Sequence, residues 1–175
     1  MKISKGTPAK YSNDAAKDGV IEMREKFGRT THGPMDVRVW LRLLSCAVTI
    51  EKRLRRKFAE EFNTTLPRFD VMAMLDRHPE GQTMGELSRA LLVSNGNVTA
   101  IVKQLQEHGL VISRPDSQDR RSSIVCLSPE GKEQFDELAK AHHGWIHAAF
   151  GDFPLEKQKQ LFGLLADLKQ SIAKE

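Results

Sequence analysis

The chain has few of the features that mark secreted or membrane proteins. Only two of its 175 residues are cysteines, and its opening stretch, MKISKGTPAKYSNDAAKDG, lacks the apolar run of a signal peptide. No later apolar run approaches the roughly 18 residues that a membrane-spanning helix needs. Two thiols without a secretory leader, Cys46 and Cys126, favour reduced side chains over a disulfide framework. We therefore expect a soluble, cytoplasmic protein that does not enter a membrane.

Signatures of catalysis are also missing. The sequence contains no G-x-S-x-G, H-E-x-x-H, P-loop or dinucleotide fingerprint, and no acid pair with the spacing of general acid–base work. His143 and His147 lie one helical turn apart as a possible metal pair, with Cys126 or His142 as a conceivable third ligand, but no second cluster with metal spacing accompanies them. We interpret these histidines as a polar helix face. Neither an enzyme nor a cofactor or metal site is expected.

The chain does have a small excess of positive charge. Its 27 Lys and Arg residues against 23 Asp and Glu give a formal charge of +4, so the distribution of cations matters more than their sum. A length of 175 residues suits one compact domain, or a small domain with appended helices, and supports a core without metal or disulfide.

Long amphipathic helices are predicted towards both ends of the chain. Apolar residues recur at helical spacing from Asp36 to about Asn63, and Ser128 with Pro129 is typical of the start of another helix, which runs to about Ala149. A final helix is predicted over about 155 to 172. Its apolar stripe exceeds what one small domain covers and therefore indicates an interface. The stripe consists of Leu161, Leu164, Leu165 and Leu168.

Shorter elements are predicted in the middle of the chain. A helix over about 67 to 77 is followed by Thr83 and Glu86, which have the capping-box spacing that begins a helix of about two turns. Ser94 is the expected cap of the next helix, and Gly109 ends it. Two strands, 110 to 114 and 122 to 127, are then joined by the polar turn PDSQD. The inward face of the Ser94 helix is predicted as Val98, Ile101, Val102 and Leu105.

Two short helices followed by a hairpin form the order of a winged helix-turn-helix. With its apolar residues inward, the Ser94 helix leaves Asn, Gln, Lys and Thr side chains for base edges and phosphates. The alternative is that these residues are merely the solvated face of a surface helix. Arg120 and Arg121 at the hairpin turn favour DNA, because long cations suit a wing that reaches phosphates or a narrow minor groove.

The same segments resemble the MarR-type (multiple antibiotic resistance regulator) transcription regulators. SNGNVTAIVKQLQEHGLVISR is similar to their recognition helix and first wing strand, and DRRSSIVCLS matches their pattern D-x-R, five residues, then L-[ST]. LPRFDVMAML and the long helices extend the resemblance over roughly 35 to 172, although the leader is longer than is common in that family. The resemblance implies that Arg121 and Arg120 approach the minor groove or its phosphates and that Asp119 orients them.

The resemblance also implies a homodimer on double-stranded DNA and a division of the chain into four parts. These are an N-terminal extension, partly mobile, over 1–33, a dimerisation helix over 34–63, a winged helix-turn-helix over 64–127 and C-terminal dimerisation helices over 128–175. The predicted DNA-binding residues are Ser94, Asn95, Asn97, Thr99, Lys103, Gln104, Arg114, Asp119, Arg120 and Arg121.

Relatives are thought to bind aromatic or carboxylate effectors between the dimer arms and the winged domain. The residues of this chain that would line such a pocket are His32, Trp40, Arg42, Arg68 and Trp145, although aromatic residues at helical spacing are more often core. Some members of the family sense oxidants through a thiol on the first helix. Because no basic motif accompanies Cys46, we interpret it as a small buried packing residue.

The sequence thus predicts a mainly α fold with a small two-stranded β-wing and long terminal dimerisation helices. The expected function is that of a ligand-responsive repressor that binds a pseudo-palindromic operator as a homodimer. The alternative, from another class, is a winged-helix protein-interaction module without sequence-specific DNA binding.

Overall fold

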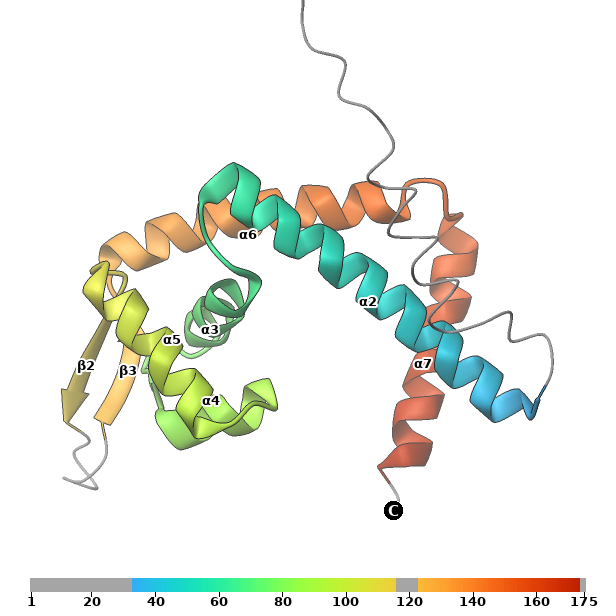
Figure 1. The fold of residues 1–175 in the computed structure, drawn as a ribbon, viewed down its shortest axis with the longest axis horizontal. Coiled ribbons are helices and arrows are strands. Elements are labelled where there is room, and N and C mark those ends of the chain that lie inside the picture. Colours follow the sequence, from blue (N-terminus) through green and yellow to red (C-terminus); the bar gives the residue numbers. More distant parts are fainter. Residues whose placement is uncertain (1–32, 116–122, 174–175) are drawn as a thin grey trace, which may run out of the picture. The chain divides into compact units, whose positions relative to one another are not determined.

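The structure, a computed structural model, describes residues 33–115 and 123–173 (Figure 1). Two compact units are distinguished, 1–53 and 54–175, and their boundary lies within the first described helix. Each unit is described by itself below. The elements are α2 (Met35–Phe62), α3 (Leu66–Asp76), β1 (Gln82–Thr83), α4 (Met84–Leu91), α5 (Asn95–Glu107), β2 (Val111–Pro115), β3 (Ser123–Leu127), α6 (Pro129–Phe150) and α7 (Leu155–Ile172).

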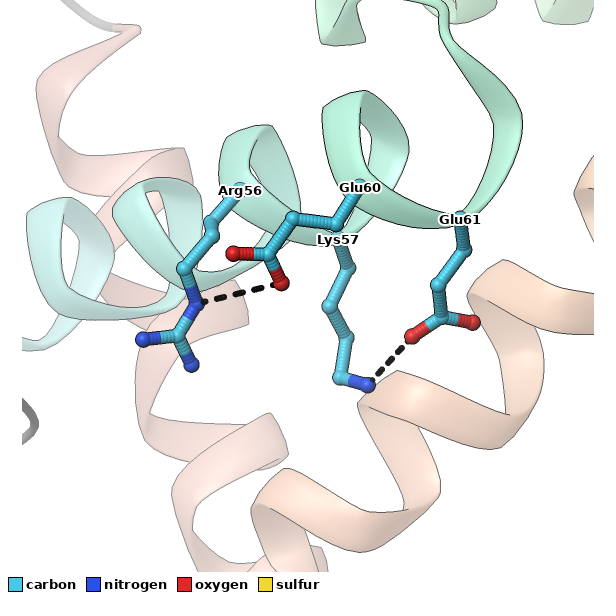
Figure 2. Close-up of polar contacts among 4 residues, drawn as sticks. All are labelled: Arg56, Lys57, Glu60 and Glu61. Carbon is cyan, nitrogen blue, oxygen red and sulfur yellow. Dashed lines mark hydrogen bonds and ion pairs between the residues drawn. The ribbon is translucent and has the colours of Figure 1, made fainter. Parts of the chain in front are cut away.

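The predicted first long helix is confirmed as α2, which ends where Asn63 adopts a left-handed conformation with φ 47°. Its buried residues, Leu54 and Phe58, belong to the unit 54–175. Figure 2 shows that two cations of the same helix, Arg56 and Lys57, pair with acids one turn later. The Arg56 Nε lies 3.9 Å from a Glu60 oxygen, and the Lys57 Nζ lies 2.7 Å from Glu61. These exposed pairs contribute little to the free energy of unfolding, but they partly neutralise the basic run in α2.

The core of the unit 54–175 gathers around α3, which contacts α4, α5, α6 and β3. Apolar side chains at helical spacing turn one face of each helix inward, and their burial supplies most of the favourable free energy of folding. The largest fully buried side chains are those of Phe58, Met72, Leu75, Leu87, Leu105, Leu138, Val71, Val98 and Val125.

The sheet has three antiparallel strands in the order β1-β3-β2. The predicted hairpin is confirmed, and its strands pair from Val111 with Leu127 to Pro115 with Ser123. Pro115 lies at the end of an edge strand, where its missing N–H leaves no ladder position unpaired. The third strand was not predicted from the sequence: Gln82 and Thr83 pair with Val125 and Ile124. A strand of two residues has no hydrophobic alternation by which a sequence would reveal it.

The predicted capping box at the start of α4 is confirmed. The Thr83 amide donates to the Glu86 carboxylate at 2.8 Å, and the Glu86 amide donates to the Thr83 hydroxyl at 3.3 Å. The backbone hydrogen bond from Thr83, and then its hydroxyl hydrogen bond, lower the pKa of Glu86. Thr83 is therefore both the last residue of β1 and the N-cap of α4. This shared residue fixes where α4 starts relative to the sheet.

The last two predicted helices are confirmed as α6 and α7. Ser128 caps α6, with its hydroxyl accepting from the Gly131 amide, and Pro129 occupies the first turn. No residue of α7 is buried within the described chain, and its apolar stripe is exposed, with 67% of Leu164 accessible to solvent. Among the described residues, no helix is both long and apolar enough to cross a membrane.

Candidate nucleic-acid interface

The helix α5 begins as the sequence predicts. The Ser94 hydroxyl accepts from the Asn97 amide at 3.4 Å, and the helix continues to Glu107, after which Gly109 takes a left-handed φ of 72°. Val98, Val102 and Leu105 are buried, whereas Ile101 is half-buried. The apolar stripe therefore holds α5 on α3 and α4 and leaves the opposite side accessible.

Six of the predicted DNA-binding residues lie on α5 or at its cap, and all six are exposed. The Thr99 hydroxyl donates to the Asn95 carbonyl at 2.8 Å, so its oxygen can still accept a hydrogen bond. The free N–H groups of the first helical turn add a partial positive charge at the same end. The six residues are Ser94, Asn95, Asn97, Thr99, Lys103 and Gln104.

The seventh, Arg114, lies on β2 and is tied to the loop before β1. Its Nη2 donates to the Glu80 carbonyl oxygen at 2.9 Å and lies 3.9 Å from the Glu80 carboxylate. More than half of the Arg114 side chain is exposed, so donors of the guanidinium fork beyond this contact face solvent. A contact between Arg114 and DNA stays a prediction.

The predicted wing residues Asp119, Arg120 and Arg121 lie outside the described residues, which stop at Pro115 and resume at Ser123. The described strands nevertheless define where the connecting segment starts and ends, because Pro115 and Ser123 are paired. The roles of the three residues stay predictions that follow from the sequence pattern.

The base of the wing is joined to α6 by hydrogen bonds and close packing among four residues, called here the wing-root junction (Gly109, Leu110, Ser128 and Gly131). The Ser128 hydroxyl donates to the Gly109 carbonyl at 2.7 Å, and the Ser128 amide donates to the Leu110 carbonyl at 3.0 Å. The Gly131 amide donates back to the Ser128 hydroxyl at 2.9 Å. A Cβ atom on Gly131 would lie 1.9 Å from the Leu110 carbonyl oxygen, so only glycine fits there.

An aromatic cluster (Phe58, Phe69, Phe135, His142 and Trp145) joins the end of α2 to α3 and α6. The Phe58 and Phe69 ring centroids are 4.8 Å apart, and the Trp145 ring meets Phe58 edge-on at 4.9 Å. The imidazole of His142 lies 4.8 Å from Phe69 and 6.2 Å from Phe58. The interpretation of the histidines as one polar face is therefore wrong for His142, because spacing alone did not reveal which side of α6 faces the phenylalanines.

The cluster predicts that stability depends on pH. Burial lowers the pKa of His142 below its ordinary value of 6.5, and the charge of His143 lowers it further. Between the lowered pKa and 6.5 the unfolded chain binds more protons, so the free energy of unfolding rises with pH and this contribution is complete above 6.5. We expect the wild-type Tm to fall between pH 7.5 and pH 5.5, and to fall less in His142→Phe.

Thermal unfolding at both pH values checks this, with His147→Gln as the matched control because His147 is exposed on the same helix. If Tm falls equally in wild type and in His142→Phe over the same pH interval, the pH dependence of stability belongs to other groups.

The structure locates four of the five predicted effector residues, two in each unit. Trp40 is 59% exposed, and Arg42 lines a shallow depression of about 140 Å³ with Met35, Arg38 and Val39. In the unit 54–175, Trp145 belongs to the aromatic cluster, and Lys57 lies 5.5 Å from the centre of its ring. The Arg68 Nε is buried and makes no hydrogen bond within the described chain. The fifth residue, His32, lies outside the described residues, and the effector site stays a prediction.

The interpretation of Cys46 as a buried packing residue is wrong for the single chain, in which its side chain is exposed. The reason is that within α2 only Leu54 and Phe58, both beyond Arg53, are buried. No group of three His, Cys, Asp or Glu side chains that could hold a metal ion occurs among residues 33–115 and 123–173.

A capped helix with an exposed polar face, packed on two shorter helices and followed by an antiparallel hairpin, defines a winged helix-turn-helix protein. Comparison with known proteins supports this class. A sequence profile described as the MarR family matches residues 62–122. The chain is 32% identical over 124 residues to the transcriptional activatory protein BadR of Rhodopseudomonas palustris, covering 67% of this chain and 69% of that protein. The chain belongs to the MarR family and is a DNA-binding transcriptional regulator.

Further relatives agree with this assignment. An uncharacterised HTH-type transcriptional regulator of Bacillus subtilis, YkoM, is 31% identical over 116 residues, covering 66% of this chain and 73% of that protein. A solved MarR family transcriptional regulator from Silicibacter pomeroyi superimposes with a TM-score of 0.68 at 28% identity, covering 78% and 94% of the two chains. AbsC, a MarR family transcriptional regulator of Streptomyces coelicolor, shares the fold with a TM-score of 0.70 at 18% identity. The match covers 83% of this chain and 100% of AbsC.

Proposed function

We propose that the protein is a homodimeric, ligand-responsive repressor that acts in the cytoplasm and has no catalytic role. Two copies of α5 enter successive major grooves of a pseudo-palindromic operator, about 34–36 Å apart, and the wings reach the adjacent minor grooves or phosphates. The observation that carries the proposal is that α5 buries its apolar stripe and exposes six polar or cationic residues together. A protein-interaction module would not need amide side chains at a helix end that already favours phosphate.

The homodimer is supported by the exposed apolar face of α7. Phe162 is 79% exposed, and Leu161, Leu165 and Phe150 line a depression of about 470 Å³ beside it. In a two-fold dimer, the same apolar face of each chain packs against its counterpart on the other chain. Both faces are then buried without any other binding surface. The predicted division into a helix over 34–63, a winged domain over 64–127 and helices over 128–175 belongs to this proposal, with 1–33 as an extension.

The effector is proposed as a small molecule with a carboxylate or an aromatic ring. The buried Arg68 Nε lacks a hydrogen-bond partner in the described chain, and a carboxylate is the partner that a guanidinium fork fits best. Such a ligand releases DNA only if it binds the conformation with spread DNA-binding lobes better than the DNA-competent one.

Two variants test the assigned roles of α5 and the wing. Asn97→Ala is expected to lower the affinity for a selected duplex about 10- to 100-fold while leaving the affinity for scrambled DNA little changed, because an amide side chain reads base edges.

Arg121→Ala is expected to weaken binding to both duplexes and to make the slope of log K against log salt shallower by about one unit per chain, because it removes a phosphate contact.

The measurement is a gel-shift or anisotropy titration at several salt concentrations, with duplexes that the wild-type protein selects from a random library. If Asn97→Ala lowers the affinity for both duplexes equally, Asn97 does not read base edges. If Arg121→Ala leaves the salt slope unchanged, Arg121 does not contact a phosphate.

Activation of transcription is the alternative to repression. It is supported by the name of the Rhodopseudomonas palustris relative, which is a transcriptional activatory protein. A reporter fused to the selected operator distinguishes the two. Deletion of the gene raises reporter output if the protein represses and lowers it if the protein activates.

A further inference from the structure

The turn between α4 and α5 holds an exposed leucine in an unfavourable backbone conformation. Leu92 ends α4 with φ 55° and ψ 36°, in the left-handed region, and 90% of its side chain is accessible to solvent. The neighbouring Val93 is 40% exposed. Glycine and asparagine adopt left-handed conformations with less strain than leucine does.

Stability of the single chain does not account for this residue. Because its side chain is almost fully exposed, Leu92 adds little to the core, and a glycine would close the turn with less strain. Isolated apolar residues on a surface are ordinary, but here exposure and backbone strain coincide. A strained conformation that the fold does not need is a reason to look for a function.

The turn is fixed by hydrogen bonds, so the backbone from which these side chains project has a defined position. The Leu92 amide donates to the Arg89 carbonyl at 3.4 Å, and the Val93 amide donates to the Ser88 carbonyl at 3.2 Å. The next residue is Ser94, the cap of α5, and the exposed Asn95 and Asn97 follow within the first turn. An apolar pair therefore adjoins the end of α5 at which bases and phosphates are expected.

We infer that Leu92, assisted by Val93, makes an apolar contact with the operator duplex beside the N-terminus of α5. Duplex DNA offers two apolar surfaces there, the C5-methyl group of thymine in the major groove and the C–H face of a deoxyribose. The contact extends the polar readout of α5 and rests on the proposed DNA-binding role of that helix. Because the turn already fixes the backbone at Leu92, the contact costs little backbone conformational freedom on binding.

Leu92→Gly separates folding from binding, because it relieves the backbone while removing the contact. We expect its Tm to rise by about 2–4 °C and its affinity for the wild-type-selected duplex to fall about tenfold for the dimer. Leu92→Met, which keeps an apolar side chain, should bind within about twofold of wild type. The salt slope should stay unchanged, because an apolar contact releases no counterions.

Replacing single thymines of the selected duplex by deoxyuridine then identifies the partner surface. If the leucine contacts a methyl group, one replacement per half-site weakens wild type and not Leu92→Gly; if it contacts a deoxyribose, every replacement affects both proteins alike. Either result supports the contact when Leu92→Gly itself binds about tenfold more weakly. Unchanged affinity of Leu92→Gly for the selected duplex overturns the inference. Loss of sequence preference in the wild type would instead overturn the proposed function of α5.

Discussion

Gly131→Ala is expected to unfold at a Tm about 6–12 °C below that of the wild type, a loss of about 3 kcal/mol of stability. The added methyl group would lie 1.9 Å from the Leu110 carbonyl oxygen, and a backbone atom cannot move aside as a flexible side chain can. Relief requires that Leu110 shift away from α6, which breaks the hydrogen bond from the Ser128 amide to its carbonyl. Since β2 follows directly, the wing should move as well, and affinity for the selected duplex should fall with stability.

Gly144→Ala is the matched control on the same helix. Apart from its chain neighbours and the nearby backbone of α6 itself, no atom of the described chain lies within 4 Å of a Cβ built there, and alanine in a helix interior is more stable than glycine by about 0.5–1 kcal/mol. Thermal and urea unfolding of the two variants compare the positions directly. Equal stabilities for Gly131→Ala and wild type would contradict the close packing of the wing-root junction.

The second large effect is expected from the apolar face of α7. The double variant Leu164→Glu, Leu168→Glu should raise the dimer dissociation constant at least about 1000-fold, because a two-fold interface loses four leucines at roughly 1.5 kcal/mol or more each. Operator binding should fall in parallel, since a single winged domain reads only one half-site. Sedimentation velocity over a range of protein concentrations measures the first effect, and the operator titration measures the second.

The control variant Gly163→Glu, Gln170→Glu adds two acids on the side of α7 opposite the apolar stripe, where both residues are exposed. It should leave the dimer and operator binding close to wild type. A wild-type chain that sediments as a monomer at all concentrations, or a dimer that survives both double variants equally, would remove α7 from the interface.

Much of the fold was predictable because its signals are local. The helices from Met35 to Phe62 and from Leu155 to Ile172 follow from apolar spacing over many turns, and their observed ends lie within a residue of the predicted ones. The capping residues Thr83, Ser94 and Ser128 could be predicted because Ser and Thr are favoured immediately before a helix. In the structure each of their hydroxyls accepts a hydrogen bond from the amide three residues later. The exposed face of α5 follows from its buried stripe.

The features that the sequence did not reveal depend on contacts between distant segments. β1 exists only because β3 lies beside it, and Gln82 and Thr83 alone do not specify a strand. His142 belongs to the aromatic cluster because Phe58 and Phe69 arrive from two other helices. Leu92 gave no signal because its residue type opposes the conformation it adopts, and such local conflicts are a reason to examine a site for function.

Sequence-specific recognition of double-stranded DNA is the central claim, and the ratio of two affinities tests it most directly. The purified wild-type protein is titrated with a duplex it has selected from a random library and with a scrambled duplex of the same composition, both near physiological salt. The account predicts that two chains bind the selected duplex at least about 1000-fold more tightly than the scrambled one. Equal affinities for the two duplexes would contradict it.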